Sequence, residues 1–331
     1  NITISSGLSN ISWGSLSPKM YMEGVPLIDD INETTASITL NYQVSAQDDE
    51  DKTEIYDVTE FYRMRYTETR IMLLDFKRSA TKVFDPSQTV VSDAGLLLGI
   101  RNKNVTYASN SDGKIVVFEQ DGDLWSYAPS SGKITRIFSF RKDENNDSRY
   151  VRTEHDIKIV RVSETGDISF VVYGYMNSDE HEGMAGSAVY HYNAERNVMQ
   201  EELFIPSSSS YQSLKQNLSV LSYVSTQDQL YMYMEGNLYQ VDLASGSYKI
   251  LKDQISSDCF VISRSQASVA WMDEMDENHS SHITAMSLES GETLRVSAPE
   301  GQKIKALGFI NEDLIYGMAN DADIQNDAAG N

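Results

Sequence analysis

The feature that most limits the fold of this chain is a weak internal repeat. The segment Gly122-Asp123-Leu124-Trp125-Ser126-Tyr127 alternates between polar and apolar positions, and a Ser-Gly turn and a second alternating segment follow it. Residues 236–241 start a second copy of this pattern, and residues 282–286 start a third. Alternation, a short turn and renewed alternation predict a β-hairpin. The hairpins of five copies have their turns at Ala80, Gly132, Asn197, Gly246 and Gly291.

The spacing of these turns predicts the size of the repeating unit. Successive turns lie between about 45 and 65 residues apart, and a four-stranded propeller blade takes about 40–50 residues. The longest interval contains two polar insertions, at 143–149 and 177–187, which we expect to be mobile surface loops. No stretch of ten or more residues has the pattern of an amphipathic helix, and residues 208–217 predict at most a short helical turn.

These units predict an all-β fold, a β-propeller of six or seven four-stranded antiparallel blades over residues 34–320. The last blade is incomplete, because only strands at 302–310 and 313–320 precede a polar tail at 321–331. Residues 1–33 form an N-terminal arm, and we expect residues 9–27 of it to pair with 302–320 and close the last blade. In the alternative, the missing strands lie in sequence outside this chain and the arm packs elsewhere. The chain begins with Asn, so we expect it to be a piece of a longer protein.

The motif Gly-x-Leu-Trp/Tyr-x-apolar, followed by Ser-Gly, resembles the repeats of bacterial WD40-like and TolB-type β-propellers. Residues 236–242 are similar to surface-exposed propellers of gut Firmicutes, many of unknown function. The resemblance covers roughly residues 34–320 and implies an extracellular or cell-surface part of a larger bacterial protein. The sequence Asp121-Gly122-Asp123 resembles part of the Asp-box of sialidase propellers, which is a structural turn. No Gly-x-Ser-x-Gly nucleophile elbow occurs, so we expect this chain not to include the peptidase domain that accompanies some propellers.

Charge and cysteine content exclude several function classes. The net charge of −22 argues against nucleic acid and against docking on an anionic membrane. No run of 18 apolar residues occurs, so we expect no membrane insertion by this segment. The single cysteine, Cys259, lies in an apolar run and is expected to be a buried thiol, and one cysteine cannot form an internal disulfide framework.

The best candidate metal site is the acidic segment 143–154. Asp143, Asn145, Asp147 and Glu154 fall at positions 1, 3, 5 and 12 of a calcium-binding loop. The glycine expected at position 6 is replaced by Ser148, and the flanking sequences predict strands rather than helices. We therefore favour a solvated loop and expect no cofactor, with Ca²⁺ as the alternative.

Two functions remain open on the sequence. The first is an extracellular or cell-surface binding or scaffold module for a protein or carbohydrate ligand. The alternative is a carbohydrate-active enzyme with carboxylates in the central channel, although no catalytic residue can be chosen from the sequence. Alternating tyrosines could stack on sugars, but we favour packing between blades. They are Tyr173, Tyr175, Tyr190, Tyr192, Tyr231, Tyr233 and Tyr239.

Overall fold

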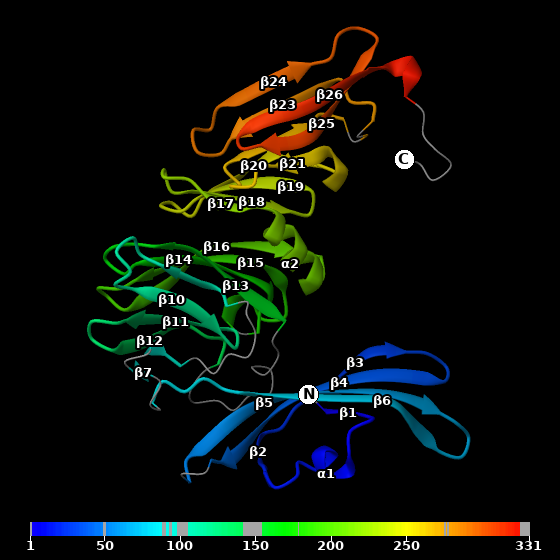
Figure 1. Ribbon diagram of the computed structural model, residues 1–331, viewed down its shortest axis with the longest axis vertical. Coiled ribbons are helices and arrows are strands. Elements are labelled where there is room, and N and C mark those ends of the chain that lie inside the picture. The colour runs from blue at the N-terminus through cyan, green and yellow to red at the C-terminus, as the bar shows by residue number, and fades with distance from the viewer. Residues whose placement is uncertain are drawn as a thin grey trace. The chain divides into compact units, whose positions relative to one another are not determined.

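A computed structural model describes residues 2–48, 51–87, 91–92, 95–97, 105–141, 154–177, 179–274, 276 and 278–324 of the chain. These residues form mostly antiparallel sheets with little helix (Figure 1). The chain divides into two compact units. The first holds residues 1–107, 113–154 and 177–183, and the second holds residues 108–112, 155–176 and 184–331.

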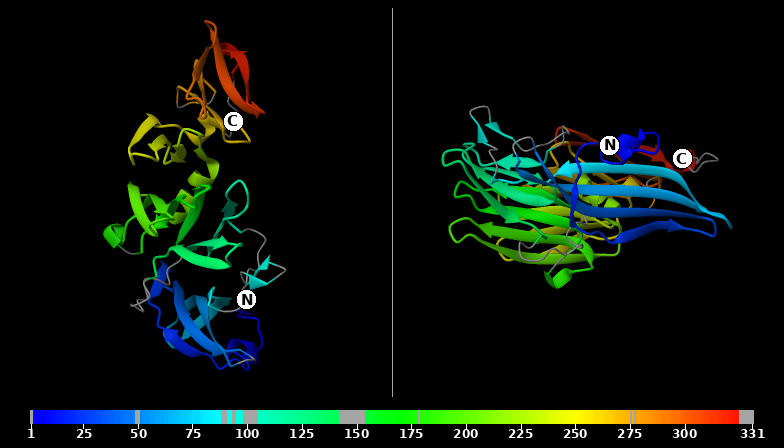
Figure 2. Two further views of the ribbon diagram at one scale, coloured as in Figure 1. Left: turned by 90° about the vertical axis from the view of Figure 1, so that its left-hand side faces the viewer. Right: turned by 90° about the horizontal axis from the view of Figure 1, so that it is seen from below.

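The first unit contains a six-stranded antiparallel sheet in which three of the strands are unusually long (Figure 2). The strands are β1 (Ile2–Thr3), β2 (Lys19–Met22), β3 (Pro26–Ile31), β4 (Thr35–Gln47), β5 (Thr53–Tyr66) and β6 (Ile71–Lys82). Their order is β1-β6-β5-β4-β2, and β3 also pairs with β4. The short helix α1 (Leu8–Ile11) precedes β2. We refer to these six strands as the long-strand sheet.

Two predictions that involve the N-terminal part of the chain are wrong. Residues 9–27 do not pair with 302–320, because β2 and β3 both pair with β4. The turn expected at Ala80 does not exist either, since Ala80 lies inside β6 and faces Val58 of β5. Long neighbouring strands in the same part of the sequence offer a local pairing, which has a smaller loop-closure cost than pairing with the far end of the chain.

Four shorter sheets have the meander topology of propeller blades, in which consecutive strands are neighbours. The first comprises β9 (Tyr107–Ser109), β10 (Val116–Gln120), β11 (Asp123–Ala128) and β12 (Lys133–Phe138). The second comprises β13 (His155–Val162), β14 (Ile168–Tyr175), β15 (Ala185–Asn193) and β16 (Val198–Ser207). The third comprises β17 (Ser222–Val224), β18 (Gln229–Met234), β19 (Asn237–Asp242) and β20 (Tyr248–Lys252). The fourth comprises β21 (Phe260–Ile262), β22 (Ser268–Met272), β23 (His282–Ser287) and β24 (Thr293–Ser297).

Smaller elements complete the described chain. Strands β25 (Gln302–Ile310) and β26 (Asp313–Asn320) form a two-stranded sheet, as do β7 (Val91–Ser92) and β8 (Gly95–Leu96). Three short 3₁₀ helices are η2 (Asp179–His181), η3 (Ser257–Cys259) and η4 (Asp321–Asp323). The all-β propeller-type fold and the hairpins turning at Gly132, Asn197, Gly246 and Gly291 are thereby confirmed, while the number of blades stays a prediction.

One helix contradicts the expectation of at most a helical turn. Helix α2 (Tyr211–Val220) has ten residues, and the Ser210 hydroxyl caps it by accepting a hydrogen bond from the Ser213 backbone N–H. Leu214 and Leu218, four residues apart, are fully buried on one side of the helix. Two apolar positions in a polar stretch give only a weak helical pattern in the sequence. The helix is therefore stabilised mainly by packing of these two leucines against the sheets.

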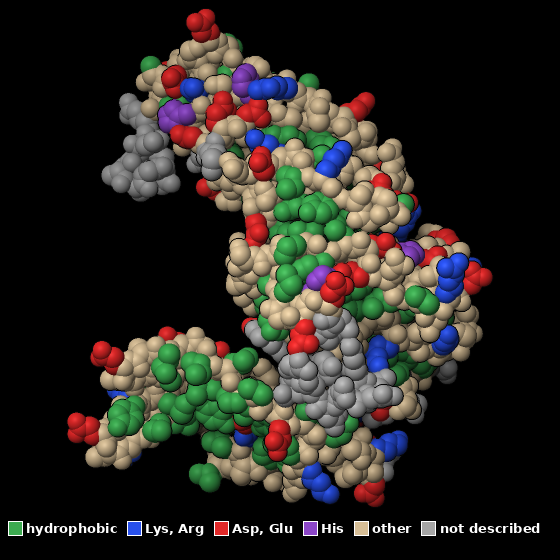
Figure 3. Space-filling model, turned by 180° about the vertical axis from the view of Figure 1, so that it is seen from behind, with side chains coloured by type: hydrophobic (Ala, Val, Ile, Leu, Met, Phe, Trp, Pro, Cys, Tyr) green, Lys and Arg blue, Asp and Glu red, His purple; other side chains and the backbone are tan. Residues whose placement is uncertain are grey.

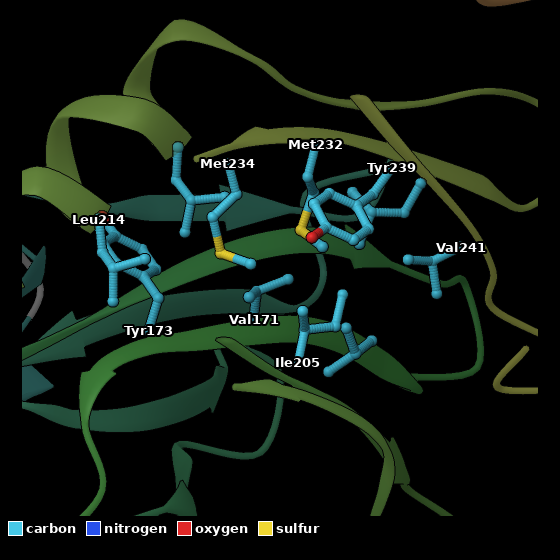
Figure 4. Packing of buried hydrophobic residues seen from close by; sticks show 11 residues of the cluster. Val171, Tyr173, Ile205, Leu214, Met232, Met234, Tyr239 and Val241 are labelled. Atoms are coloured by element: carbon cyan, nitrogen blue, oxygen red, sulfur yellow. The ribbon is translucent and has the colours of Figure 1, made fainter. Parts of the chain in front are cut away.

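The core of the second unit fills the space between adjacent sheets. Val171 and Ile205 of the second four-stranded sheet pack with Met232 and Met234 of the third, and Leu214 of α2 covers one end of this cluster (Figure 4). Six of the seven alternating tyrosines are buried, with Tyr175 half-buried. Tyr173, Tyr231, Tyr233 and Tyr239 belong to apolar clusters between sheets, which confirms the expected packing between blades for these four. The expected burial of Cys259 is confirmed as well.

Candidate functional site

A recurring turn joins the first and second strands of successive sheets. In the turns 163–167, 225–229 and 263–268, the backbone N–H of the leading serine bonds to the carbonyl oxygen of the last residue. The hydroxyl of each serine also accepts a hydrogen bond from the N–H of that last residue. Each turn contains a residue with positive φ, namely Gly166, Asp228 or Gln266. These recurring Ser-containing turns are a signal in the sequence that the hairpin pattern does not include.

Acidic side chains join neighbouring sheets to one another at turns of this kind. The Glu164 carboxylate accepts hydrogen bonds from Ser111 N–H at 2.9 Å and from Asn110 Nδ2 at 3.0 Å. The Glu289 carboxylate accepts from the Tyr223 hydroxyl at 2.7 Å and from Thr226 N–H at 3.1 Å. Hydrogen bonds from Ser111 and Thr226 lower the pKa of Glu164 and Glu289, respectively.

The last junction of this kind uses Glu312, whose carboxylate accepts a hydrogen bond from the Ser265 hydroxyl at 2.6 Å. This bond lowers the pKa of Glu312. At another junction Asp228 forms an ion pair with Arg161. We call Glu164, Asp228, Glu289 and Glu312 the junction carboxylates. Because three of them are stabilised as anions, these three are poor candidates for a general acid at neutral pH.

A polar groove of about 490 Å³ lies beside the ion pair of Arg161 and Asp228 in the second unit. Four carboxylates line it, those of Glu164, Asp167, Glu202 and Asp228, and His191 lies among them. The lining contains no Tyr, Trp or Phe, so this groove offers no aromatic platform for a sugar ring.

A second groove, of about 570 Å³, lies between the fourth four-stranded sheet and the turn end of the two-stranded sheet formed by β25 and β26. Leu294 of β24, Phe309 of β25 and Leu314 are among the residues that line it. Leu294 is 63% exposed, whereas Phe309 and Leu314 are partly buried against the core cluster around Ile283. We call this groove the half-sheet groove.

Strand β26 starts at this half-sheet groove, which Asp313 and Leu314 line, and its outer edge carries backbone groups that no described strand pairs with. In each complete sheet of the second unit, the second strand pairs on both sides, as β18 does with β17 and β19. Among the described residues, β26 pairs with β25 alone. Tyr316 and Met318 on β26 are 42% and 43% exposed. An open edge with exposed apolar side chains is a template for adding a strand.

The most strongly perturbed carboxylates lie in the first unit, around Arg141. Its guanidinium lies 3.9 Å from the Asp123 carboxylate and 3.7 Å from that of Asp57, and it donates to the backbone oxygen of Asp121. Burial raises the pKa of Asp123 to about 6, although Arg141 and the hydroxyl of Ser139 oppose the shift. Burial also raises the pKa of Asp121.

This cluster is poorly placed for catalysis on an external substrate. Asp123 is only 6% exposed. The cluster also explains the likeness to an Asp-box, because Asp121 and Gly122 both have positive φ and turn the chain between β10 and β11. Asp121 Oδ2 accepts hydrogen bonds from Phe84 N–H and Gln120 Nε2. The cluster therefore fixes this turn against the long-strand sheet.

The predicted calcium ligands cannot be compared with one another. Asp143, Asn145 and Asp147 lie outside the described residues, and Glu154 is described. In the described part of the chain, no group of three or more His, Cys, Asp or Glu side chains could hold a metal ion. His279 and His282 have separate partners, Asp276 and Ser297. Calcium binding by residues 143–154 stays a prediction.

No protein-family model matches the chain, and no curated protein matches it. Among solved structures, TolB from Acinetobacter baumannii has 13% sequence identity and a TM-score of 0.33, with 79% of this chain and 60% of TolB covered. The extracellular domain of BT4673 from B. thetaiotaomicron has 11% identity and a TM-score of 0.31, covering 85% of this chain and 35% of that one. Dipeptidyl peptidase 4 from Porphyromonas gingivalis has 10% identity and a TM-score of 0.37, covering 92% and 50%.

The chain therefore spans at most 60% of the length of these three structures. Its own sheets define its class, which is an all-β protein built from antiparallel blades of β-propeller type. TolB gives its name to the TolB-type propellers, whose repeats the Gly-x-Leu-Trp/Tyr motif of this chain resembles. No helix in the described part of the chain is long and apolar enough to cross a membrane.

Proposed function

We propose that this chain is an extracellular or cell-surface binding module that holds an extended polypeptide segment in the half-sheet groove. The observation that carries the proposal is the unpaired outer edge of β26 beside exposed Leu294. Backbone groups of the edge would bind any extended chain, and the apolar wall would select alternate side chains. The repeat motif, through its resemblance to TolB-type propellers, supports the location.

A protein ligand fits the described grooves better than a carbohydrate. Six of the tyrosines that could stack on sugars are buried in the core. The groove with four carboxylates has no aromatic platform, and the carboxylates with raised pKa, Asp121 and Asp123, are packed around Arg141. No described arrangement favours the alternative of a carbohydrate-active enzyme.

The chain itself supplies a probe for the half-sheet groove. A synthetic hairpin of residues 282–297, which are the third and fourth strands of the neighbouring sheet, has the strand pattern that β26 lacks beside it. We expect the fluorescein-labelled hairpin to bind the protein in a fluorescence-anisotropy titration. Leu294→Asp in the protein should weaken binding at least tenfold, because it places a charge in the apolar wall.

Leu307→Asp is the matched control, since Leu307 is 62% exposed and does not line the half-sheet groove. It should leave the affinity unchanged. Absence of binding at millimolar peptide, or an equal loss in both variants, would contradict the proposal. Binding to a glycan array that Leu294→Asp leaves intact would favour a carbohydrate ligand at another place.

A further inference from the structure

The long-strand sheet has one apolar face and one polar face. Residues that pair directly across neighbouring strands lie on the same face, and the register places Ile31, Ala36, Met64 and Leu73 in one row. Tyr66 and Ile71 form the next row toward the β5–β6 turn. The alternate positions carry polar residues such as Ser37, Thr39, Arg63 and Arg65. The alternation therefore gathers the apolar side chains on one side of the sheet.

One half of the apolar face is covered by the chain itself. There Tyr42, Val44 and Val58 are buried, with Trp13 from the segment before β2 packed against them. Arg78 lies beneath Trp13, with its guanidinium carbon 4.3 Å from the ring centroid, and forms an ion pair with buried Glu60. In this half, side chains from outside the sheet therefore cover its apolar face and remove it from water.

The other half is bare among the described residues. Ile28, Ile31 and Ile71 are 64%, 68% and 67% exposed, Tyr66 is 63% exposed and Leu73 is 47% exposed. A shallow apolar cavity of about 180 Å³ lies between Ile31, Met64, Tyr66 and Ile71. Figure 3 shows hydrophobic side chains gathered over this sheet. We call these five exposed residues the bare patch.

We propose that the bare patch is a homodimer interface, where it packs face to face on the same patch of a second copy of this chain. The five side chains together expose on the order of 600 Å² of apolar surface. This area is at the upper end of the range for the largest apolar patch on a typical monomeric protein. Two copies would bury about 1,200 Å², which reaches the lower limit of specific protein–protein interfaces. A two-fold axis between the sheets makes the patch its own complement, and twisted sheets pack in this way in β-sandwiches.

Charge favours a second copy over a charged partner at this patch. The bare patch contains no ionisable group other than the Tyr66 hydroxyl, so a partner surface must also be apolar to match it. The chain as a whole carries a net charge of −22, so two copies repel one another at long range. Added salt screens that repulsion and leaves apolar contact intact. We therefore expect salt to strengthen dimerisation, the opposite of its effect on a contact made by ion pairs.

Sedimentation velocity of the full chain at 50 mM and 500 mM NaCl tests the proposal. The wild type should shift from monomer to dimer over micromolar concentrations, with at least a threefold lower dissociation constant at the higher salt. Ile71→Asp should weaken the dimer at least tenfold. Met72→Asp is the matched control, because Met72 pairs with Arg65 on the polar face and is 38% exposed.

The outcomes separate the possible roles of the patch. A wild type that stays monomeric at both salt concentrations overturns the proposal, and so does equal weakening by Ile71→Asp and Met72→Asp. If Ile71→Asp lowers the melting temperature of a monomeric protein strongly while Met72→Asp does not, the patch is buried within the chain itself, and the proposal is also overturned. Far-UV circular dichroism of both variants checks that the fold is retained.

Discussion

Replacement of Asp123 by Asn should remove a pH-dependent loss of stability from the first unit. Asp123 begins β11 and accepts a hydrogen bond from the Ser139 hydroxyl at 2.7 Å, which an Asn side-chain oxygen can also accept. Asn already holds the corresponding place in the repeat, as Asn237 at the start of β19. The change therefore keeps the shape of the turn and removes the buried charge near Arg141.

The sign and size of the effect follow from the pKa of Asp123. Burial raises this pKa from 3.8 to about 6, so the folded protein holds the proton more tightly than the unfolded chain does. The stability that this group contributes is fully present below pH 3.8 and is lost as the pH rises through about 6. At about 1.4 kcal/mol for each pKa unit, the loss between pH 4 and pH 7 is about 2–3 kcal/mol. Asn cannot ionise, so the variant avoids this loss.

Urea unfolding followed by tryptophan fluorescence at pH 4, 5, 6 and 7 measures the difference. The stability of Asp123→Asn minus that of the wild type should increase by about 2–3 kcal/mol across this range. Asp242→Asn is a control of opposite sign, since hydrogen bonds led by that from Gln229 lower the pKa of Asp242, and its stability contribution is lost as the pH falls. A difference for Asp123→Asn that is flat with pH, or that decreases as the pH rises, would refute the reasoning.

Three further changes test other parts of the structure. Arg78→Met should destabilise the first unit by about 3–5 kcal/mol in urea unfolding, because Glu60 would keep a buried charge without its cation. Gly246→Ala should cost at least about 2 kcal/mol more than Gly132→Ala by the same assay, although both glycines have positive φ. A Cβ at Gly246 would lie 2.6 Å from a backbone oxygen, whereas none lies within 4 Å at Gly132. Millimolar Ca²⁺ should leave the melting temperature unchanged in differential scanning fluorimetry; a rise that Asp143→Ala abolishes would instead establish a calcium site.

The repeating sheets could be predicted from the sequence because their signals are local. Alternating residues and turn glycines fix each hairpin within about fifteen residues, and the predicted strands 302–310 and 313–320 coincide with β25 and β26. The third-strand motif at 236–241 likewise overlaps β19. A period-two pattern of apolar residues does not depend on distant contacts, so it can be recognised in a single sequence.

The long-strand sheet and α2 could not be predicted in the same way. Strand β6 runs through Ala80 because β5 offers a partner along its whole length, and no turn residue in 70–82 marks that choice. Helix α2 forms because Leu214 and Leu218 fit between the sheets. The cluster of Asp123 and Arg141 could not be predicted for a related reason. These two residues are 18 positions apart in the sequence, and only folding brings them together.

The junction carboxylates have a consequence for how such a chain can change over evolutionary time. Glu164 and Glu312 sit in the same turn of their own sheets and reach back to a Ser in the first turn of the preceding one. The fourth sheet carries both parts, since the Ser265 hydroxyl donates to Glu312 of the following hairpin and the Glu289 carboxylate accepts a hydrogen bond from Thr226 of the preceding sheet. Tandem duplication of a whole four-stranded unit would therefore place a hydroxyl next to a carboxylate at the new contact between sheets, without any new mutation. Deletion of one unit would likewise bring a hydroxyl and a carboxylate of the remaining sheets together. The number of repeats in relatives of this chain should then vary by whole units, while partial insertions should be confined to connecting segments such as 179–184, between β14 and β15.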